Sequence, residues 1–312
     1  MNYEMIELRK KIGDILCEMG EANHKIYVLD SDLAKSTTSI KFKEKFPDRF
    51  IETGIAETSA MSIATGIASE GQIPFYVNFA TFISGTAWTQ LRQAAYANAN
   101  VKMIATHPGM DNGPDGASHH ANEDIALVRA IPNVKLLIPS NVKELRQAIE
   151  IAINYNGPVY IRCARDVVPD VELNQDVKIG KAIVVDDQGD DFAIVYEGTA
   201  TTVAYKGYEK LKEKGYKGKL INIFSVKPID IELVNKLAST VEVIVTVENH
   251  SIIGGLGGAI SEILAQNPQH AKLRMVGVQD MFTESGKAVD IKTKYGITAE
   301  NIIEKVETAI IK

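Results

Sequence analysis

The sequence predicts an α/β protein of two domains, each with a mostly parallel sheet between two layers of helices. Three observations lead to this prediction. Apolar segments rich in β-branched and aromatic residues alternate with segments of helical period, as in α/β layering. The apolar segments are nearly continuous, as burial of both faces of a sheet requires. Between residues 166 and 191 an acidic, turn-rich stretch separates two such series.

The first series occupies residues 1–170, and its first sixteen residues are predicted to form a helix. The pattern then predicts strands over 25–32, 49–54, 73–79, 101–107, 134–140 and 158–164. Helices are predicted between these strands over 57–70, 84–97, 122–130 and 142–154.

The second domain is predicted over residues 191–312, after a linker over 171–190 that carries a short strand. Its strands are expected over 191–198, 218–225 and 241–249, and its helices over 200–214, 230–239 and 257–266. A glycine-rich turn, GGLGGA, precedes the last of these helices, but its spacing is not that of a dinucleotide fingerprint.

Length and composition set limits on function. The 312 residues suffice for two domains with cores, and 45% hydrophobic with 24% charged residues is typical of globular proteins. The net charge of −6 argues against nonspecific binding to nucleic acid or to an anionic membrane. No signal layout or spanning apolar run is present, so a cytoplasmic protein is expected. Cys17 and Cys163 are distant, which disfavours a disulfide framework.

In open α/β sheets, ligands bind at the carboxyl ends of the strands. In the first domain this rule gathers polar and aromatic residues from distant segments at one edge. They are Ser31, Asp32, the segment 54–57, Asn78, Phe79, Thr106, His107, Ala164 and Arg165. This edge is therefore the predicted binding site.

Glu57 follows a strand and opens an apolar helix, GIAETSAMSIATGIASEG. One interpretation is a carboxylate that complements the helix N-terminus. The other is a carboxyl in apolar surroundings whose pKa is raised, so that it stays protonated and donates a hydrogen bond. The segment NFATF places Phe79 and Phe82 three residues apart, either as core packing or as a pocket for a flat heteroaromatic ligand.

The loop THPGMDNGPDGASHHANED, residues 106–124, concentrates titratable side chains on a glycine-rich backbone. His119 and His120 are adjacent, and His107 is far from both, which is not the spacing of a common zinc site. Hydrogen bonding and proton transfer by these imidazoles, with Asp115 beside them, fit the pattern better. No metal ligands are predicted in this chain.

Together, GIAE with its small-residue helix, DGASHHANEDIALVRAIPN and VENHSIIGGLGGAISE resemble the transketolase family of thiamine diphosphate enzymes, in its C-terminal half. The resemblance covers nearly the whole chain. It implies a pyrimidine-binding domain followed by the family's C-terminal domain.

The resemblance also implies roles for individual residues. Glu57 looks like the glutamate that hydrogen-bonds the aminopyrimidine ring, and Phe79 and Phe82 look like the aromatic pocket around that ring. Asp32 and Ile55 look like residues near the cofactor, Asp32 at a subunit interface. A third pocket aromatic is replaced by Gly85, for which Trp88 is a substitute only if it turns inward.

On the substrate side, His107, Asp115 and His119 look like residues that contact the sugar and assist proton transfers. His120 stands where glutamine is common, so its role is open. The family holds a substrate phosphate with residues that match Arg9, Ser36, His107 and Arg165 here. A planar guanidinium suits this task because it bonds phosphate oxygens in pairs.

The family binds the diphosphate through Mg²⁺ with a Gly-Asp-Gly motif and a later asparagine, and this sequence has no Gly-Asp-Gly. The resemblance therefore implies the C-terminal subunit of a split transketolase that moves a two-carbon ketol unit between sugar phosphates. Its partner would carry the motif and the Mg²⁺, in an assembly of two copies of each chain. Alternatives are a 2-oxo acid dehydrogenase β-subunit, a relative of deoxyxylulose-phosphate synthase, and a noncatalytic homologue.

Overall fold

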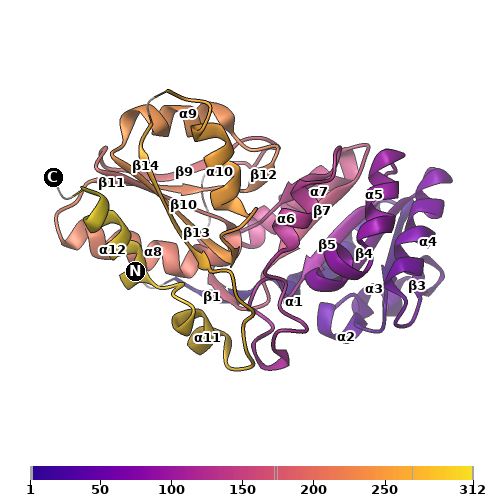
Figure 1. Cartoon of the computed structure of the whole chain (residues 1–312). Coiled ribbons are helices and arrows are strands. Elements are labelled where there is room, and N and C mark those ends of the chain that lie inside the picture. Colours follow the sequence, from indigo (N-terminus) through magenta and orange to yellow (C-terminus); the bar gives the residue numbers. More distant parts are fainter. Residues whose placement is uncertain (1–2, 172, 174, 269, 311–312) are drawn as a thin grey trace.

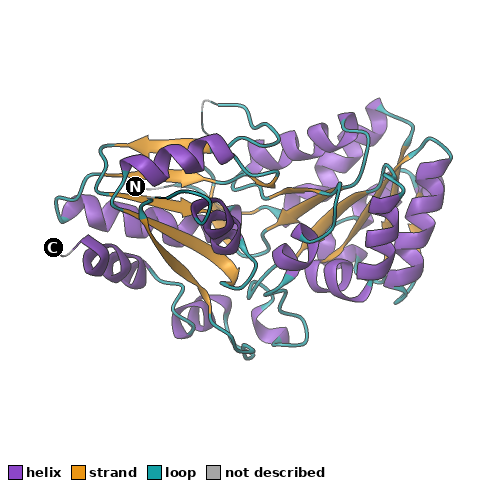
Figure 2. Cartoon of the chain, turned by 45° about the horizontal axis from the view of Figure 1, so that its top comes forward, coloured by secondary structure: helices purple, strands orange, loops and turns teal. Residues whose placement is uncertain are grey.

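The computed structural model describes residues 3–171, 173, 175–268 and 270–310. Two α/β halves lie side by side, the first from indigo to pink and the second from orange to yellow in Figure 1. Helices cover both faces of each sheet (Figure 2). The predicted fold class, two α/β domains with mostly parallel sheets, is confirmed. Where the linker begins and ends stays a prediction.

The first sheet has seven strands in the described residues. Their order is β12 (Ser225–Lys227), β6 (Lys135–Leu137), β7 (Val159–Cys163), β5 (Lys102–Thr106), β4 (Ile73–Phe79), β2 (Ile26–Asp30) and β3 (Phe50–Glu52). All neighbours pair in parallel except β12 with β6. Successive residues of β4 enter opposite cores, Tyr76 on one face and Phe75 and Val77 on the other. This alternation explains why the whole strand is apolar.

The second sheet has five strands in the described part of the chain. Their order is β14 (Lys272–Val278), β13 (Val243–Ser251), β10 (Phe192–Tyr196), β11 (Gly218–Asn222) and β9 (Ile183–Asp187). Only β9 is antiparallel to its neighbour. One hydrophobic core contains Tyr76 and Met103 of the first sheet and Val195 and Ile244 of the second. The two halves therefore share buried contacts.

The predicted helices after the first lie within a few residues of observed helices, whereas the second, the third and the last two helices of the structure were not predicted. In the first half they are α1 (Arg9–Ala22), α2 (Ala34–Thr37), α3 (Ile40–Lys45), α4 (Glu57–Ser69), α5 (Trp88–Tyr96), α6 (Asp124–Arg129) and α7 (Val142–Asn154). In the second half they are α8 (Thr201–Glu213), α9 (Ile231–Thr240), α10 (Leu256–Leu264), α11 (Ala288–Lys294) and α12 (Ala299–Ile310). Helix α7 starts where the Asn141 side chain accepts a hydrogen bond from the N–H of Glu144.

The structure corrects the prediction of a helix over the first sixteen residues. The helix begins only at Arg9, because residues Met5–Glu7 form strand β1, which pairs with β8 (Val167–Pro169). That pairing joins segments about half the chain apart, and local periodicity does not reveal it. No helix among the described residues is long and apolar enough to cross a membrane.

Candidate active site

An aromatic cluster forms where β4 and β5 end. The rings of Phe79 and Phe82 stack with centroids 5.9 Å apart and planes 9° apart. The His107 imidazole lies 3.9 Å from the Phe79 ring, and His119 meets the Phe82 ring edge-on at 5.4 Å. The structure therefore brings four of the predicted site residues into one cluster at the predicted edge of the sheet.

Glu57 lies at the first position of α4 and is buried. Burial raises the pKa of the Tyr76 hydroxyl, and the charge of Glu57 adds to this increase. Helix α4, which begins at Glu57, packs on β4. The same hydroxyl lies 3.0 Å from the Ser31 hydroxyl and accepts a hydrogen bond of 2.8 Å from the Asn78 amide. Glu57 is thus close to the polar end of β4, where Asn78 directly precedes Phe79. Its protonated state stays a prediction.

A basic cluster surrounds His107. Burial, followed by the positive charges of Arg9 and Arg165, lowers the pKa of His107 to about 3. Arg9 donates a hydrogen bond of 2.6 Å to the backbone carbonyl of Ser36, and its Nε is buried without a hydrogen-bond partner among the described residues. Arg9 therefore contacts Ser36, the charges of Arg9 and Arg165 act on His107, and one buried donor of Arg9 has no partner among the described residues.

Asp32 and Ile55 lie on an exposed rim of this edge. Asp32 has a positive φ of 63°, and its N–H donates to Glu52 Oε1 at 2.9 Å. The Ile55 side chain is 80% exposed. Both side chains face solvent in the isolated chain, so neither contributes to the buried part of the site.

In the rest of the 106–124 loop, some side chains face solvent and others contact the second domain. Asp115 is exposed in a turn, and His119 lies 2.9 Å from the Ser118 hydroxyl. His120 is buried, with Nδ1 2.6 Å from the Thr283 hydroxyl and Nε2 3.3 Å from the Gly113 carbonyl. His120, whose role is open from the sequence, thus joins the loop to the second domain. Within the described residues, no three His, Cys, Asp or Glu side chains are grouped to hold a metal.

There is open space at Gly85, where the transketolase family has a third pocket aromatic. A Cβ placed on Gly85 would meet nothing within 4 Å. The Trp88 indole is engaged elsewhere, because its N–H donates to the Leu127 carbonyl at 3.1 Å and its ring packs on the core. Trp88 therefore does not substitute for the third aromatic of the pocket.

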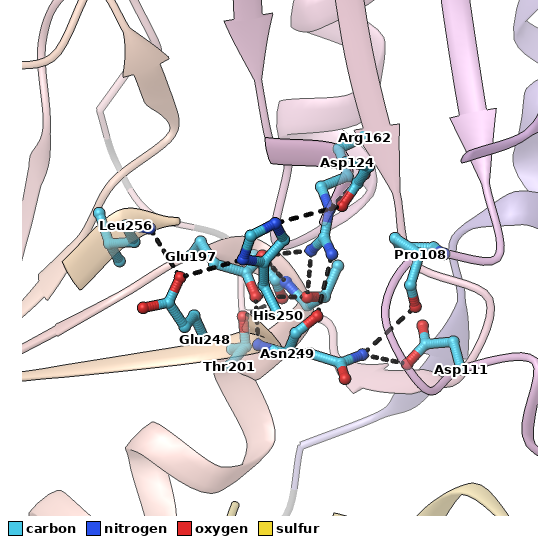
Figure 3. Close-up of polar contacts among 12 residues, drawn as sticks. Pro108, Asp111, Asp124, Arg162, Glu197, Thr201, Glu248, Asn249, His250 and Leu256 are labelled. Atoms are coloured by element: carbon cyan, nitrogen blue, oxygen red, sulfur yellow. Dashed lines mark hydrogen bonds and ion pairs between the residues drawn. The ribbon is translucent and has the colours of Figure 1, made fainter. Parts of the chain in front are cut away.

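A buried ionic network at the junction of the domains was not predicted (Figure 3). Arg162 has no exposed surface and donates to Asp124 at 2.8 Å, to Glu197 at 3.2 Å and to the Asn249 carbonyl at 2.9 Å. In the sequence, this network is indicated by an arginine inside the otherwise apolar strand VYIRC. A charge in a strand buried on both faces requires partners, but nothing in the sequence names them.

Two further buried carboxylates support the site. Burial raises the pKa of Asp30 to about 6, and its oxygens accept from Leu33 N–H and from the Thr37 and Ser39 hydroxyls, which shapes the segment around Ser36. Burial raises the pKa of Glu248 to about 8.

Glu248 also explains the glycine-rich turn. It accepts from the N–H groups of Leu256 and Gly257 at the start of α10, and a Cβ on Gly255 would lie 1.9 Å from its carboxylate. Gly255 of GGLGGA therefore makes room for an internal carboxylate.

The families and individual proteins that this chain resembles match it over most of its length. The pyrimidine-binding domain of transketolase matches residues 4–170, and the transketolase C-terminal domain matches residues 180–302. A protein of Methanocaldococcus jannaschii described as a transketolase C-terminal section is 39% identical over 303 residues, which cover 96% of this chain and 95% of that protein. One subunit of the apulose-4-phosphate transketolase of Phocaeicola vulgatus is 34% identical, with 97% of each chain covered. A solved structure described as a split-gene transketolase, inactive β4 tetramer, has a TM-score of 0.89 at 38% identity and covers 98% of both chains.

Proposed function

Because this chain belongs to the transketolase family, we propose that it is the C-terminal subunit of a split transketolase. Full-length similarity to a transketolase C-terminal section and to one subunit of another transketolase supports this proposal. The printed sequence has no Gly-Asp-Gly, and we propose that an N-terminal partner subunit carries this motif and a later asparagine and holds the diphosphate and Mg²⁺. We expect two copies of each chain in the complex.

The family implies thiamine diphosphate, and the residues present fit its aminopyrimidine. The stacked Phe79 and Phe82 offer a flat apolar wall, the open space at Gly85 leaves room beside it, and Glu57 is buried close by. When bound, the cofactor supplies the carbon nucleophile that cleaves and forms the carbon–carbon bond. Glu57 would hold a proton toward a ring nitrogen of the pyrimidine, while Asp32 and Ile55 would meet the cofactor at the exposed rim.

We also propose that this chain binds the phosphate group of its substrate. The observation that carries it is the buried Nε of Arg9, which has no hydrogen-bond partner among the described residues, beside a His107 whose pKa the charges of Arg9 and Arg165 lower further. Burial keeps His107 neutral, and the Thr106 hydroxyl, 2.8 Å from Nδ1, leaves Nε2 for a ligand. Ser36 lies against Arg9 and completes the predicted phosphate set.

The proposed reaction transfers a two-carbon ketol unit from a ketose phosphate to an aldose phosphate. His107 and His119 would hold the sugar's hydroxyls and carbonyl oxygen and move protons there, as imidazoles in an active site do. Asp115, exposed on the same loop, would contact the outer hydroxyls. The glycines of the loop let its backbone approach the sugar closely.

A substrate comparison tests this proposal. With the partner subunit, thiamine diphosphate and Mg²⁺ present, we expect turnover of xylulose 5-phosphate with an aldose phosphate acceptor. The kcat/KM for xylulose 5-phosphate should exceed that for unphosphorylated xylulose at least about a hundredfold, because two charge-assisted hydrogen bonds contribute about 1.5–3 kcal/mol each.

The substitution Arg9→Met should remove most of this preference for the phosphorylated sugar. Arg146→Met is the matched control, because Arg146 pairs with Glu18 on the surface, and it should leave the preference unchanged. Turnover of pyruvate without turnover of xylulose 5-phosphate would favour a 2-oxo acid dehydrogenase subunit instead.

A further inference from the structure

We propose that Asn249 and Lys292, both in the second domain, are positioning residues that hold the phosphate-binding residues His107 and Arg165 in place. This inference rests on the proposed function. It assigns to the second domain a direct effect on substrate binding, through the carboxylate of Asp111 in the 106–124 loop.

Asp111 is the point where the loop, the end of β7 and the second domain meet. Its side chain is fully buried. Oδ2 accepts the N–H of Arg165 at 2.9 Å and of Asp166 at 3.1 Å. Oδ1 accepts the amide of Asn249 at 2.8 Å and the ammonium of Lys292 at 2.7 Å. Arg165 also donates through Nη1 to the Asp111 carbonyl at 3.1 Å, so this one residue fixes the arginine twice.

Asn249 reaches the loop from β13 (Figure 3). Its Oδ1 accepts the N–H of Met110 at 3.0 Å, and its Nδ2 also donates to the Pro108 carbonyl at 3.4 Å. The loop passes so close that a Cβ on Gly109 would lie 2.1 Å from the Asn249 carbonyl oxygen, and Gly109 has a φ of +55°. A side chain at Gly109 would therefore separate the loop from β13.

The Asn249 backbone is itself fixed on both sides of its Cα. Its N–H donates to Glu197 at 2.9 Å, and its carbonyl accepts from Arg162 at 2.9 Å. The ionic network therefore provides a rigid base for the amide that holds the loop.

Lys292 reaches Asp111 from α11. Its ammonium also lies 3.0 Å from Asp166, and its side chain is only 12% exposed. Burial disfavours the charged forms of Asp111 and Lys292, but the attraction between their opposite charges is stronger. The pKa of Asp111 is held below its usual range and that of Lys292 above its own. Arg165, Asp166, Asn249 and Lys292 line one cavity of about 770 Å³. Without Lys292, a buried carboxylate would lose its only cationic hydrogen-bond partner among the described residues.

This anchoring matters because the active conformation is strained. His107 has a positive φ of 57°, which costs free energy for a residue other than glycine and requires surrounding contacts to maintain it. Asp111 follows His107 by four residues, and its carboxylate fixes the backbone of Arg165. Loosening Asp111 should therefore displace both phosphate ligands while leaving Glu57 and the Phe79–Phe82 pair untouched.

The kinetic test uses Lys292→Met in the complex with the partner subunit. We expect kcat/KM for xylulose 5-phosphate to fall at least tenfold more than kcat/KM for unphosphorylated xylulose, because both sugars lose contact with His107 but only the phosphorylated sugar also loses Arg165. Lys292→Arg should restore most of the affinity, because it returns a cation to Asp111. Lys294→Met is the matched control on the same helix, since Lys294 is exposed and interacts with Glu284 and the Tyr295 ring, away from Asp111. An equal loss for both sugars would overturn the inference.

Hydrogen exchange gives a readout that does not depend on activity. In Lys292→Met, the amides of residues 107–111 and 165–166 should exchange at least tenfold faster, with α7 unchanged. Asn249→Ala, which keeps the ion pair, is the second variant should Lys292→Met fail to fold. Unchanged exchange in these segments would overturn the inference. An inactive wild-type complex would instead contradict the proposed function, and exchange would still decide the positioning role.

Discussion

The substitution Glu57→Gln is expected to lower kcat of the reconstituted complex at least a hundredfold. A positioned group that transfers or holds a proton contributes about 10²–10⁴-fold to the rate. Glu57 is buried at the start of α4, beside the end of β4 that carries Phe79. An amide keeps the size of the side chain and removes its acidic proton, so we expect the fold to be retained and the chemistry to be lost.

The effect is measured by steady-state kinetics with saturating thiamine diphosphate and Mg²⁺. Glu70→Gln is the control, because this exposed glutamate lies at the other end of the same helix. The control should keep full activity, and both variants should keep the wild-type thermal midpoint. Activity within tenfold of wild type in Glu57→Gln would remove Glu57 from the mechanism and favour a noncatalytic role for the carboxylate.

The substitution Arg162→Met should lower the free energy of unfolding by about 3–5 kcal/mol, because removing one partner of a buried ion pair leaves uncompensated charge. Here two carboxylates, Asp124 and Glu197, lose their shared guanidinium, and all three side chains are fully buried. Urea unfolding followed by circular dichroism measures the change.

Arg146→Met, which breaks an exposed pair with Glu18, should change the same free energy by about 0.5 kcal/mol or less. Adding Asp124→Asn and Glu197→Gln to Arg162→Met should recover part of the loss, since the stranded charges are then removed. A loss below about 1 kcal/mol in Arg162→Met would mean that the network is solvated or rearranges.

Most of the fold follows from local pattern. The fully buried β4 reads as a continuous apolar segment, and α7 combines an asparagine cap with an apolar stripe, so its bounds match the prediction. Strands β1 and β12 were missed because each has three residues and pairs with a segment far away in the sequence. The last elements, β14, α11 and α12, were not predicted, although α12 carries an apolar stripe, Ile302, Ile303 and Val306, that packs on the second sheet.

The candidate site, like the fold, could be predicted only where local sequence pattern is sufficient. The rule that ligands gather at strand ends selects Glu57, Phe79, His107 and Arg165 from the positions of the strands alone, and their roles stay predictions. It could not find Asp111 as an anchor, since its partners Asn249 and Lys292 are 138 and 181 residues away. Nor could it find the contact of His120 with Thr283, which depends on how the second domain packs against the loop.

We propose that this chain supplies one half of an active site whose other half is on a partner subunit. The most direct test measures ketol transfer from xylulose 5-phosphate by the purified chain alone and after mixing with the N-terminal partner, in each case with thiamine diphosphate and Mg²⁺. We predict no turnover by the chain alone and full activity at equimolar partner. Robust turnover by the chain alone would contradict the claim.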